Sequence, residues 1–190
     1  MITSTPAALA GLATLALVGG AALTWAPSDA ATGHRPPAQR TVPAKAATGP
    51  VTCVGGTAKG LVSKLSAEPF SFSGTTGNDV PVTGARVNVK GPQRGTDTVL
   101  VTFSAESYYS GSGWMGIEVH KDGVPIAPFA DNGSPLAFTS NSSYVSASAQ
   151  FCTKVGRGTH VLTVEASTTG DATTDSGWLD DWTMSVQRYE

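Results

Sequence analysis

The sequence has 190 residues, and its 12 Lys and Arg residues against 14 Asp and Glu residues give a formal net charge of −2. The basic residues form no cluster within residues 51–190, which excludes the basic surface that nucleic-acid binding requires. Residues 51–190 are enough for one domain that buries roughly two-thirds of its unfolded surface.

The first thirty residues have the features of a secretory signal. Residues 7–26 are apolar and uncharged, and Ser28 and Ala30 are small residues at the two positions that a signal peptidase recognises. No Lys or Arg precedes Arg35, so the usual basic start is missing. An uncleaved apolar anchor is the alternative, because about 20 apolar residues can span a bilayer. We therefore predict a secreted protein and leave open its anchoring to a membrane through residues 1–30.

Residues 31–50 contain four prolines and almost no bulky apolar side chain. Such a segment buries too little apolar surface to offset its ordering entropy. We predict a disordered, Pro/Ala-rich linker, followed by the folded domain at residues 51–190.

Strand patterns run through that domain. Apolar and polar residues alternate in residues 97–105 and 114–120, and Asp122-Gly123 has the composition of a tight hairpin turn. Similar alternation recurs in residues 85–89, 145–151, 159–167 and 182–189. Pro125 and Pro128 cannot donate to a strand ladder, so the strand after the turn is predicted to be short or at an edge. Eight to ten short strands without a long helix predict an all-β, antiparallel sandwich or barrel.

Cys53 and Cys152 are the two cysteines of the chain. In an exported protein such a pair is predicted to form a disulfide. Odd and even positions of a strand point to opposite faces, and Cys152 differs in this parity from the apolar residues of its strand. The bridge should therefore hold the N-terminal segment against the outside of a sheet. Two free thiols are the expectation if the domain stays in the cytoplasm.

Four segments together carry a resemblance to a known family: TVLVTFSAES, IEVHKDGVPIAP, SASAQFCTKVGRGTHVLTVEAS and WTMSVQRY. Their series resembles the strands of the C1q/TNF-like jelly-roll domain of small secreted actinobacterial proteins, over about residues 85–190. The resemblance implies a β-sandwich of jelly-roll type and a binding role. It implies no catalytic residues.

Aromatic residues gather near two segments that are predicted to be loops. Tyr108, Tyr109 and Trp114 surround a Ser-Gly loop, and Trp178 and Trp182 flank an acidic one. Flat rings on loops stack on sugars or anchor protein partners. Tyr108, Tyr109, Trp114 and Trp178 are therefore the candidate ligand-binding residues. The alternative is that these rings cover the open ends of the sandwich, and Trp182, in phase with its strand's apolar residues, is expected in the core.

The acidic loop offers a weak calcium candidate. Its aspartates are Asp171, Asp175, Asp180 and Asp181. Ca²⁺ takes six to eight oxygen ligands, but the spacing matches no EF-hand, and a solvated acidic loop is the alternative. No zinc ligand set is recognisable, and no cofactor is predicted.

His120 and His160 are the two histidines of the domain. His120 has the polar parity of its strand and is expected to be exposed, whereas His160 is expected to cap the core and bond a loop carbonyl. A Ser-His-acid triad needs one of them, but no G-x-S-x-G motif is present.

These observations predict a secreted, non-enzymatic binding or surface-interaction protein. One alternative is a carbohydrate-binding module that uses Tyr109 and Trp114, and another is a small secreted hydrolase that uses His120 or His160. Cell-wall polysaccharide, a protein partner and self-association into a homo-oligomer all stay open as partners.

Overall fold

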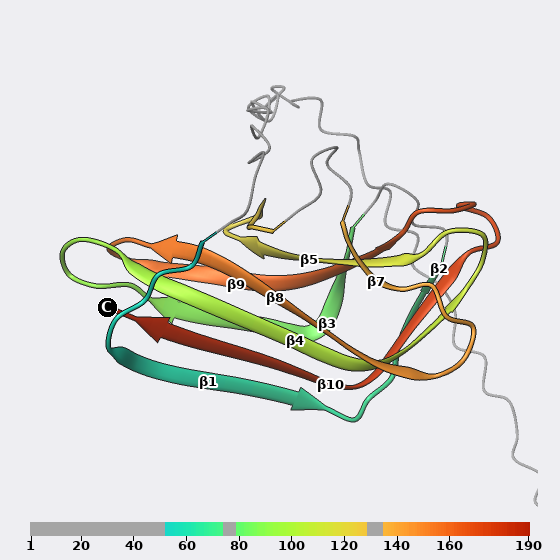
Figure 1. The fold of residues 1–190 in the computed structure, drawn as a ribbon, viewed down its shortest axis with the longest axis horizontal. Coiled ribbons are helices and arrows are strands. Elements are labelled where there is room, and N and C mark those ends of the chain that lie inside the picture. The colour runs from blue at the N-terminus through green and yellow to red at the C-terminus, as the bar shows by residue number, and fades with distance from the viewer. Residues whose placement is uncertain (1–51, 74–78, 129–134) are drawn as a thin grey trace, which may run out of the picture. The chain divides into compact units, whose positions relative to one another are not determined.

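The computed structural model describes residues 52–73, 79–128 and 135–190, and the predicted signal or anchor and linker (residues 1–50) lie outside them. The described residues form two antiparallel β-sheets (Figure 1) and contain no helix long and apolar enough to cross a membrane. The first sheet contains β1 (Ala58–Ser66), β2 (Phe70–Ser73), β4 (Asp97–Ser110), β8 (Val145–Val155) and β10 (Ser176–Tyr189). The second contains β3 (Val80–Lys90), β5 (Met115–Lys121), β6 (Val124–Pro125), β7 (Leu136–Thr139) and β9 (Thr159–Thr168).

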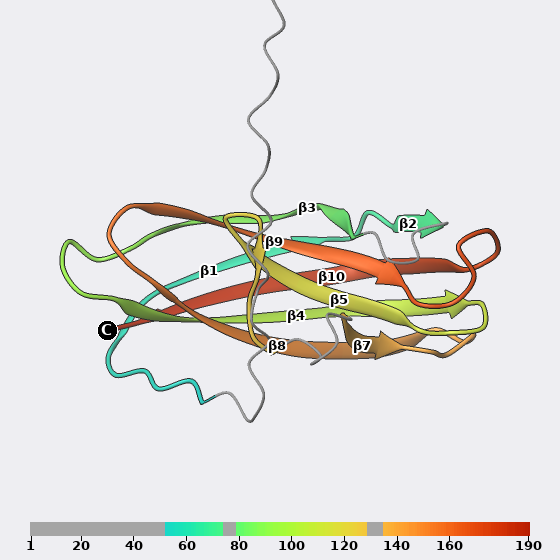
Figure 2. The same cartoon turned by 90° about the horizontal axis from the view of Figure 1, so that it is seen from above.

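The chain passes repeatedly from one sheet to the other. In the first sheet the strand order is β1-β10-β4-β8, and β2 pairs with the start of β10. In the second it is β3-β9-β5-β6, and β7 also pairs with β5. Figure 2 shows the strands of both sheets from above. This arrangement confirms the predicted antiparallel β-sandwich of jelly-roll type. The two-residue β6 confirms that the proline-containing strand is short.

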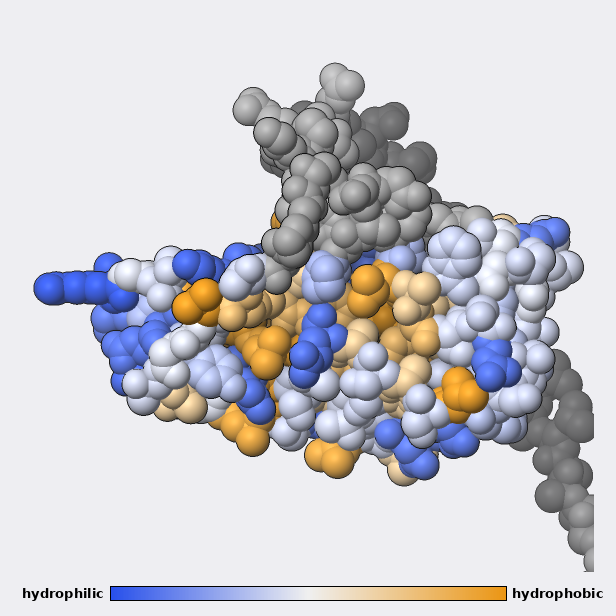
Figure 3. Space-filling view, viewed as in Figure 1, coloured by the Kyte–Doolittle hydropathy of each residue, from blue (hydrophilic) through white to orange (hydrophobic). Residues whose placement is uncertain are grey.

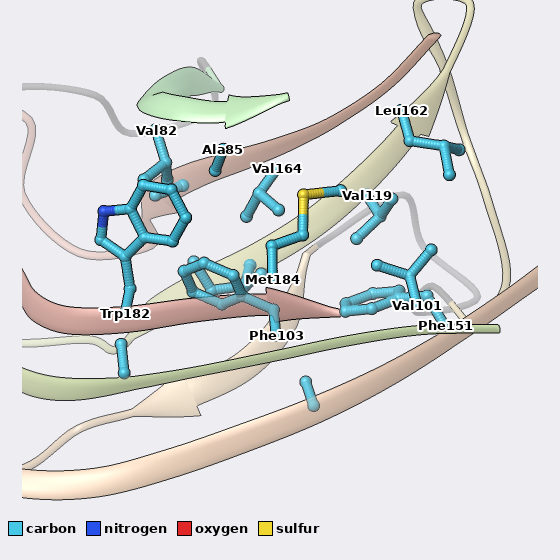
Figure 4. Packing of buried hydrophobic residues seen from close by; sticks show 14 of the residues in the cluster. Val82, Ala85, Val101, Phe103, Val119, Phe151, Leu162, Val164, Trp182 and Met184 are labelled. Carbon is cyan, nitrogen blue, oxygen red and sulfur yellow. The ribbon is translucent and has the colours of Figure 1, made fainter. Parts of the chain in front are cut away.

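The core lies between the two sheets and follows the alternation of the sequence. Figure 4 shows Val101, Phe103 and Met184 of the first sheet facing side chains of the second. The residues that they face include Val82, Ala85, Val119, Leu162 and Val164. Trp182 is 3% exposed, which confirms its expected place in the core.

A β-bulge in β10 changes which face its residues present. Asp180 pairs with Glu106 of β4, but Thr183 pairs with Ser104, so β10 holds one extra residue. Asp181, inside the bulge, has a left-handed φ of 45°. In a regular strand Trp178 and Trp182 would share a face. Because of the bulge, Trp182 points into the core and Trp178 points to the outside.

Cys53 and Cys152 form a disulfide with their Cα atoms 6.1 Å apart, as predicted. The segment before β1 crosses the outside of the first sheet (Figure 1), where the Thr98 hydroxyl donates to the Val54 carbonyl at 2.6 Å. Leu100 faces outward, unlike its apolar neighbours in β4, and it lines a small depression together with Cys53. The crossing segment therefore lies over the face of the sheet to which this leucine points.

Candidate functional site

A row of aromatic side chains crosses the outer face of the first sheet. Trp178 of β10 pairs with Tyr108 of β4 on one side and with Ser71 of β2 on the other. Because Ser107 pairs with Val145, Tyr144 occupies the next place in the same row. The ring centroids of Tyr108 and Tyr144 are 5.4 Å apart, and those of Tyr144 and Trp178 are 5.0 Å apart.

The row borders a depression of about 430 Å³, which we call the aromatic groove. Its outward-facing rings are Tyr108, Tyr144 and Trp178, and its hydroxyls come from Ser71, Ser73 and Ser176. Phe72, whose side chain is buried in the core, also borders it. Gly177 completes the lining, and a Cβ at this position would overlap the Phe72 ring. Among the described residues, no charged side chain lines the groove. The groove therefore offers apolar ring faces and neutral hydrogen-bonding groups together.

Two of the four predicted ligand-binding residues, Tyr108 and Trp178, lie in the aromatic groove. Trp114 is 39% exposed but does not line the groove, and its backbone N–H donates to the Thr169 hydroxyl at 3.1 Å. Tyr144, 63% exposed, was not predicted. Its polar parity just before a strand was the available signal, but the pairing of β8 with β4 was needed to place it beside Tyr108.

Tyr109 corrects the prediction of a ring exposed on a loop. Its side chain is 1% exposed, because Tyr109 has the core parity of β4. Its hydroxyl donates to Asp175 Oδ2 at 2.5 Å and accepts from the Gly113 N–H at 2.8 Å. Burial and the bond to Asp175 raise the pKa of Tyr109. Tyr109 thus fixes the loops at this end of the sandwich and does not face a ligand.

The structure does not gather the four predicted calcium ligands into one site. Asp175 is fully buried against Tyr109. Asp171 accepts bonds from the N–H and hydroxyl of Thr173, which lower the pKa of Asp171. Asp180 accepts from the Asp181 N–H within the bulge. In the described part of the chain these aspartates form no convergent group of metal-ligand atoms.

His120 is buried, contrary to the expectation of an exposed ring. It is 8% exposed, and its Nε2 donates to Glu118 Oε2 at 2.9 Å while Nδ1 lies 3.3 Å from Glu165 Oε1. Burial lowers the pKa of His120, but the bond to Glu118 and the charges of Glu165, Glu118 and Asp79 outweigh it, so the pKa is raised overall. One ligand atom from each of Asp79, His120 and Glu165 lies within 4.8 Å of the others. These residues could hold a metal ion.

The predicted bond of His160 to a loop carbonyl is confirmed, since its Nε2 faces the Gly156 carbonyl at 3.2 Å. Its Nδ1 bonds Asp122 Oδ2 at 2.7 Å, an interaction that the sequence did not suggest. Both nitrogens of His120 and of His160 therefore face carboxylate or carbonyl oxygens. Within the described residues, no serine hydroxyl is hydrogen-bonded to either ring.

The fold and the site define a jelly-roll β-sandwich with a solvent-facing aromatic groove. No family model and no curated protein matches the chain. Among solved structures, the chain is similar to dimeric latent PorU from Porphyromonas gingivalis, with 16% identity and a TM-score of 0.34 over 75% of this chain and 14% of that one. It is also similar to a family 35 carbohydrate binding module from Clostridium thermocellum, with 14% identity and a TM-score of 0.29 over 67% of this chain and 98% of that one. Both TM-scores are too low to indicate a ligand or an activity.

A second exposed surface lies along β1. Hydrophobic side chains line the lower margin of Figure 3, where Figure 1 places this strand. The exposed hydrophobic residues of β1 are Leu61, Val62 and Leu65. Lys59 and Lys64 lie on the same strand, and lysines on an edge strand oppose pairing with another chain.

Proposed function

We propose that this protein is a secreted, non-enzymatic binding protein whose aromatic groove holds a neutral saccharide, such as part of a cell-wall polysaccharide. The observation that carries the proposal is the transverse row of Tyr108, Tyr144 and Trp178 beside a groove of about 430 Å³. Exposed aromatic rings bury a large area at low entropic cost.

The chemistry of the groove supports this ligand class. Sugar rings present apolar C–H faces and hydroxyl edges, and the groove offers aromatic rings beside Ser71, Ser73 and Ser176. Because none of its described lining residues is charged, these residues do not supply the groups that would recognise an anionic polymer or a charged peptide motif. The volume lies within the range of about 300–1,000 Å³ that is typical of small-molecule sites.

The disulfide supports an extracellular location, because disulfides persist in oxidising compartments. The engagement of both nitrogens in His120 and in His160 supports a non-enzymatic role, because neither ring has a described serine partner to activate. Membership of the C1q/TNF-like group and the hydrolase alternative stay predictions.

The test is binding of the full chain to insoluble peptidoglycan, chitin and cellulose. We expect one polymer to be bound and Trp178→Ala and Tyr144→Ala each to weaken binding by about tenfold, which is 1.4 kcal/mol per ring. Trp114→Ala is the matched control, since Trp114 is also partly exposed but lies outside the groove. If none of the polymers is bound, or if Trp114→Ala weakens binding as much as Trp178→Ala, the proposal fails.

A further inference from the structure

Three neighbouring strands of the second sheet bring polar groups to one point on its outer face. Asp79 immediately precedes β3, Glu165 lies on β9 and His120 lies on β5. The strand order is β3-β9-β5, so each strand contributes one residue. One ligand atom from each residue lies within 4.8 Å of the other two.

The charges at this point do not balance. Glu118 is 6% exposed and lies directly opposite Glu165 across the β5–β9 ladder, where like charges destabilise a sheet. Asp79 adds a third carboxylate to the single imidazole of His120. Among the described residues, no Lys or Arg forms an ion pair with any of these carboxylates. Three carboxylates therefore face one imidazole, and the group is short of positive charge. Glu118 and His120 are buried, and buried charges are normally paired or coordinate a metal.

His120 is oriented as a metal ligand would be. Its Nε2 donates to Glu118 at 2.9 Å, which leaves Nδ1 facing Glu165 Oε1 at 3.3 Å. That separation is too long for a charge-assisted hydrogen bond, which is about 2.7–2.9 Å. It matches the roughly 3.3 Å between two ligand atoms that each lie about 2.0–2.1 Å from a tetrahedral zinc ion. A carboxylate that accepts from the second nitrogen of a metal-bound histidine is the usual outer partner.

A buried and unsatisfied hydroxyl adds an independent observation. Ser167 is 2% exposed and shares the outward parity of Glu165 on β9. Its hydroxyl approaches the Asp79 carboxylate closely enough to interact with it, but among the described residues it meets no partner at full hydrogen-bond geometry. A metal-bound water at the fourth position would give this hydroxyl a partner.

We propose that Asp79, His120 and Glu165 bind one divalent metal ion, and that Glu118 is the positioning residue for His120. One imidazole nitrogen and two carboxylate oxygens suit Zn²⁺, which takes three protein ligands and a water. Ca²⁺ and Mg²⁺ prefer six or more oxygen ligands. The ion ties the start of β3 to β9 and β5. This site lies on the sheet opposite to the aromatic groove and does not depend on the proposed saccharide binding.

The test is a calorimetric titration of the full, chelator-treated chain with Zn²⁺ and, separately, with Ca²⁺. We expect one Zn²⁺ per chain and weaker or no binding of Ca²⁺. Asp79→Asn and His120→Gln should each weaken Zn²⁺ binding by at least tenfold. Glu118→Gln should weaken it by about 10- to 100-fold, as outer partners of metal-bound histidines do. His160→Gln is the matched control, because it removes another carboxylate-bonded histidine outside the site, and it should leave the affinity unchanged.

Thermal unfolding gives a second readout of the same variants. Zn²⁺ should raise the Tm of the parent chain and of His160→Gln, but not that of Asp79→Asn. Asp79 is exposed, so Asp79→Asn decides the matter if His120→Gln does not fold. Absence of Zn²⁺ binding, tighter binding of Ca²⁺, or unchanged Zn²⁺ affinity in Asp79→Asn would overturn the proposal.

Discussion

Replacing Tyr109 with Phe tests whether this residue supports the fold, in contrast to its neighbour Tyr108. The Tyr109 hydroxyl donates to Asp175 Oδ2 at 2.5 Å and accepts from the Gly113 N–H at 2.8 Å. Removal of the hydroxyl takes away the shortest bond of the fully buried Asp175 carboxylate. Two further contacts of that carboxylate are longer, at 3.3 Å from the Ser112 N–H and 3.4 Å from the Thr174 hydroxyl.

A hydrogen bond to a charged group contributes about 1.5–3 kcal/mol, and a donor or acceptor left unsatisfied adds to the loss. We therefore expect Tyr109→Phe to lower the free energy of unfolding by about 2–4 kcal/mol. The measurement is urea unfolding followed by tryptophan fluorescence. With m-values of about 1–3 kcal/mol/M in urea, the midpoint should fall by at least about 0.7 M.

Tyr108→Phe is the matched control. The Tyr108 ring faces outward in the aromatic groove, and its hydroxyl forms no hydrogen bond with the described residues. Surface changes of this kind usually alter stability by less than about 0.5 kcal/mol. A loss below about 0.5 kcal/mol for Tyr109→Phe, or an equal loss for both variants, would refute the assignment of Tyr109 to the interior.

Two further predictions concern the bridge and the hairpin turn. Changing both Cys53 and Cys152, which are 99 residues apart, to Ser should reduce the free energy of unfolding by up to about 4.7 kcal/mol, because the unfolded chain regains loop entropy. Urea unfolding of the parent and the double variant measures this, and a loss under about 1 kcal/mol would contradict it. Asp122 accepts hydrogen bonds from the His160 ring and from the Val161 N–H, and these bonds lower the pKa of Asp122. The stabilisation that they give is present above the unfolded pKa of about 3.9, and it is lost as the pH falls through the pKa of the folded state. Asp122→Asn should therefore lose more stability relative to the parent at pH 6 than at pH 2.5, and an equal difference at both pH values would count against this.

Much of the fold was predictable because most of the long strands, among them β4, β8 and β10, carry their own two-residue alternation. The inward places of Val101, Phe103 and Trp182 follow from that period alone, and so does the outward place of Cys152. The disulfide was predictable because the sequence offers one pairing. Leu100 broke the pattern, and the structure gives the reason: the crossing segment around Cys53 lies on this face.

Parity also misled where it was treated as exposure. His120 has the outward parity that the alternation predicts, yet it is buried against Glu118 and Glu165. Parity specifies only the face of the sheet to which a side chain points. Whether that face is open to solvent depends on what packs over it, which the local sequence does not encode.

The sequence by itself determined most of the strands, the face of each residue within a regular strand and the bridge, because these depend on local alternation and on a count of two cysteines. It did not reveal β1, whose residues do not alternate in burial. Tertiary structure decided which strands lie side by side, and hence that Tyr108, Tyr144 and Trp178 form one row and that Asp79, His120 and Glu165 meet at one point. It also decided the bulge at Asp181, which turns Trp178 outward although Trp182, four residues later, points inward. Strand register arises from the packing of whole sheets against each other, so residues distant in the sequence become neighbours only when the sandwich closes.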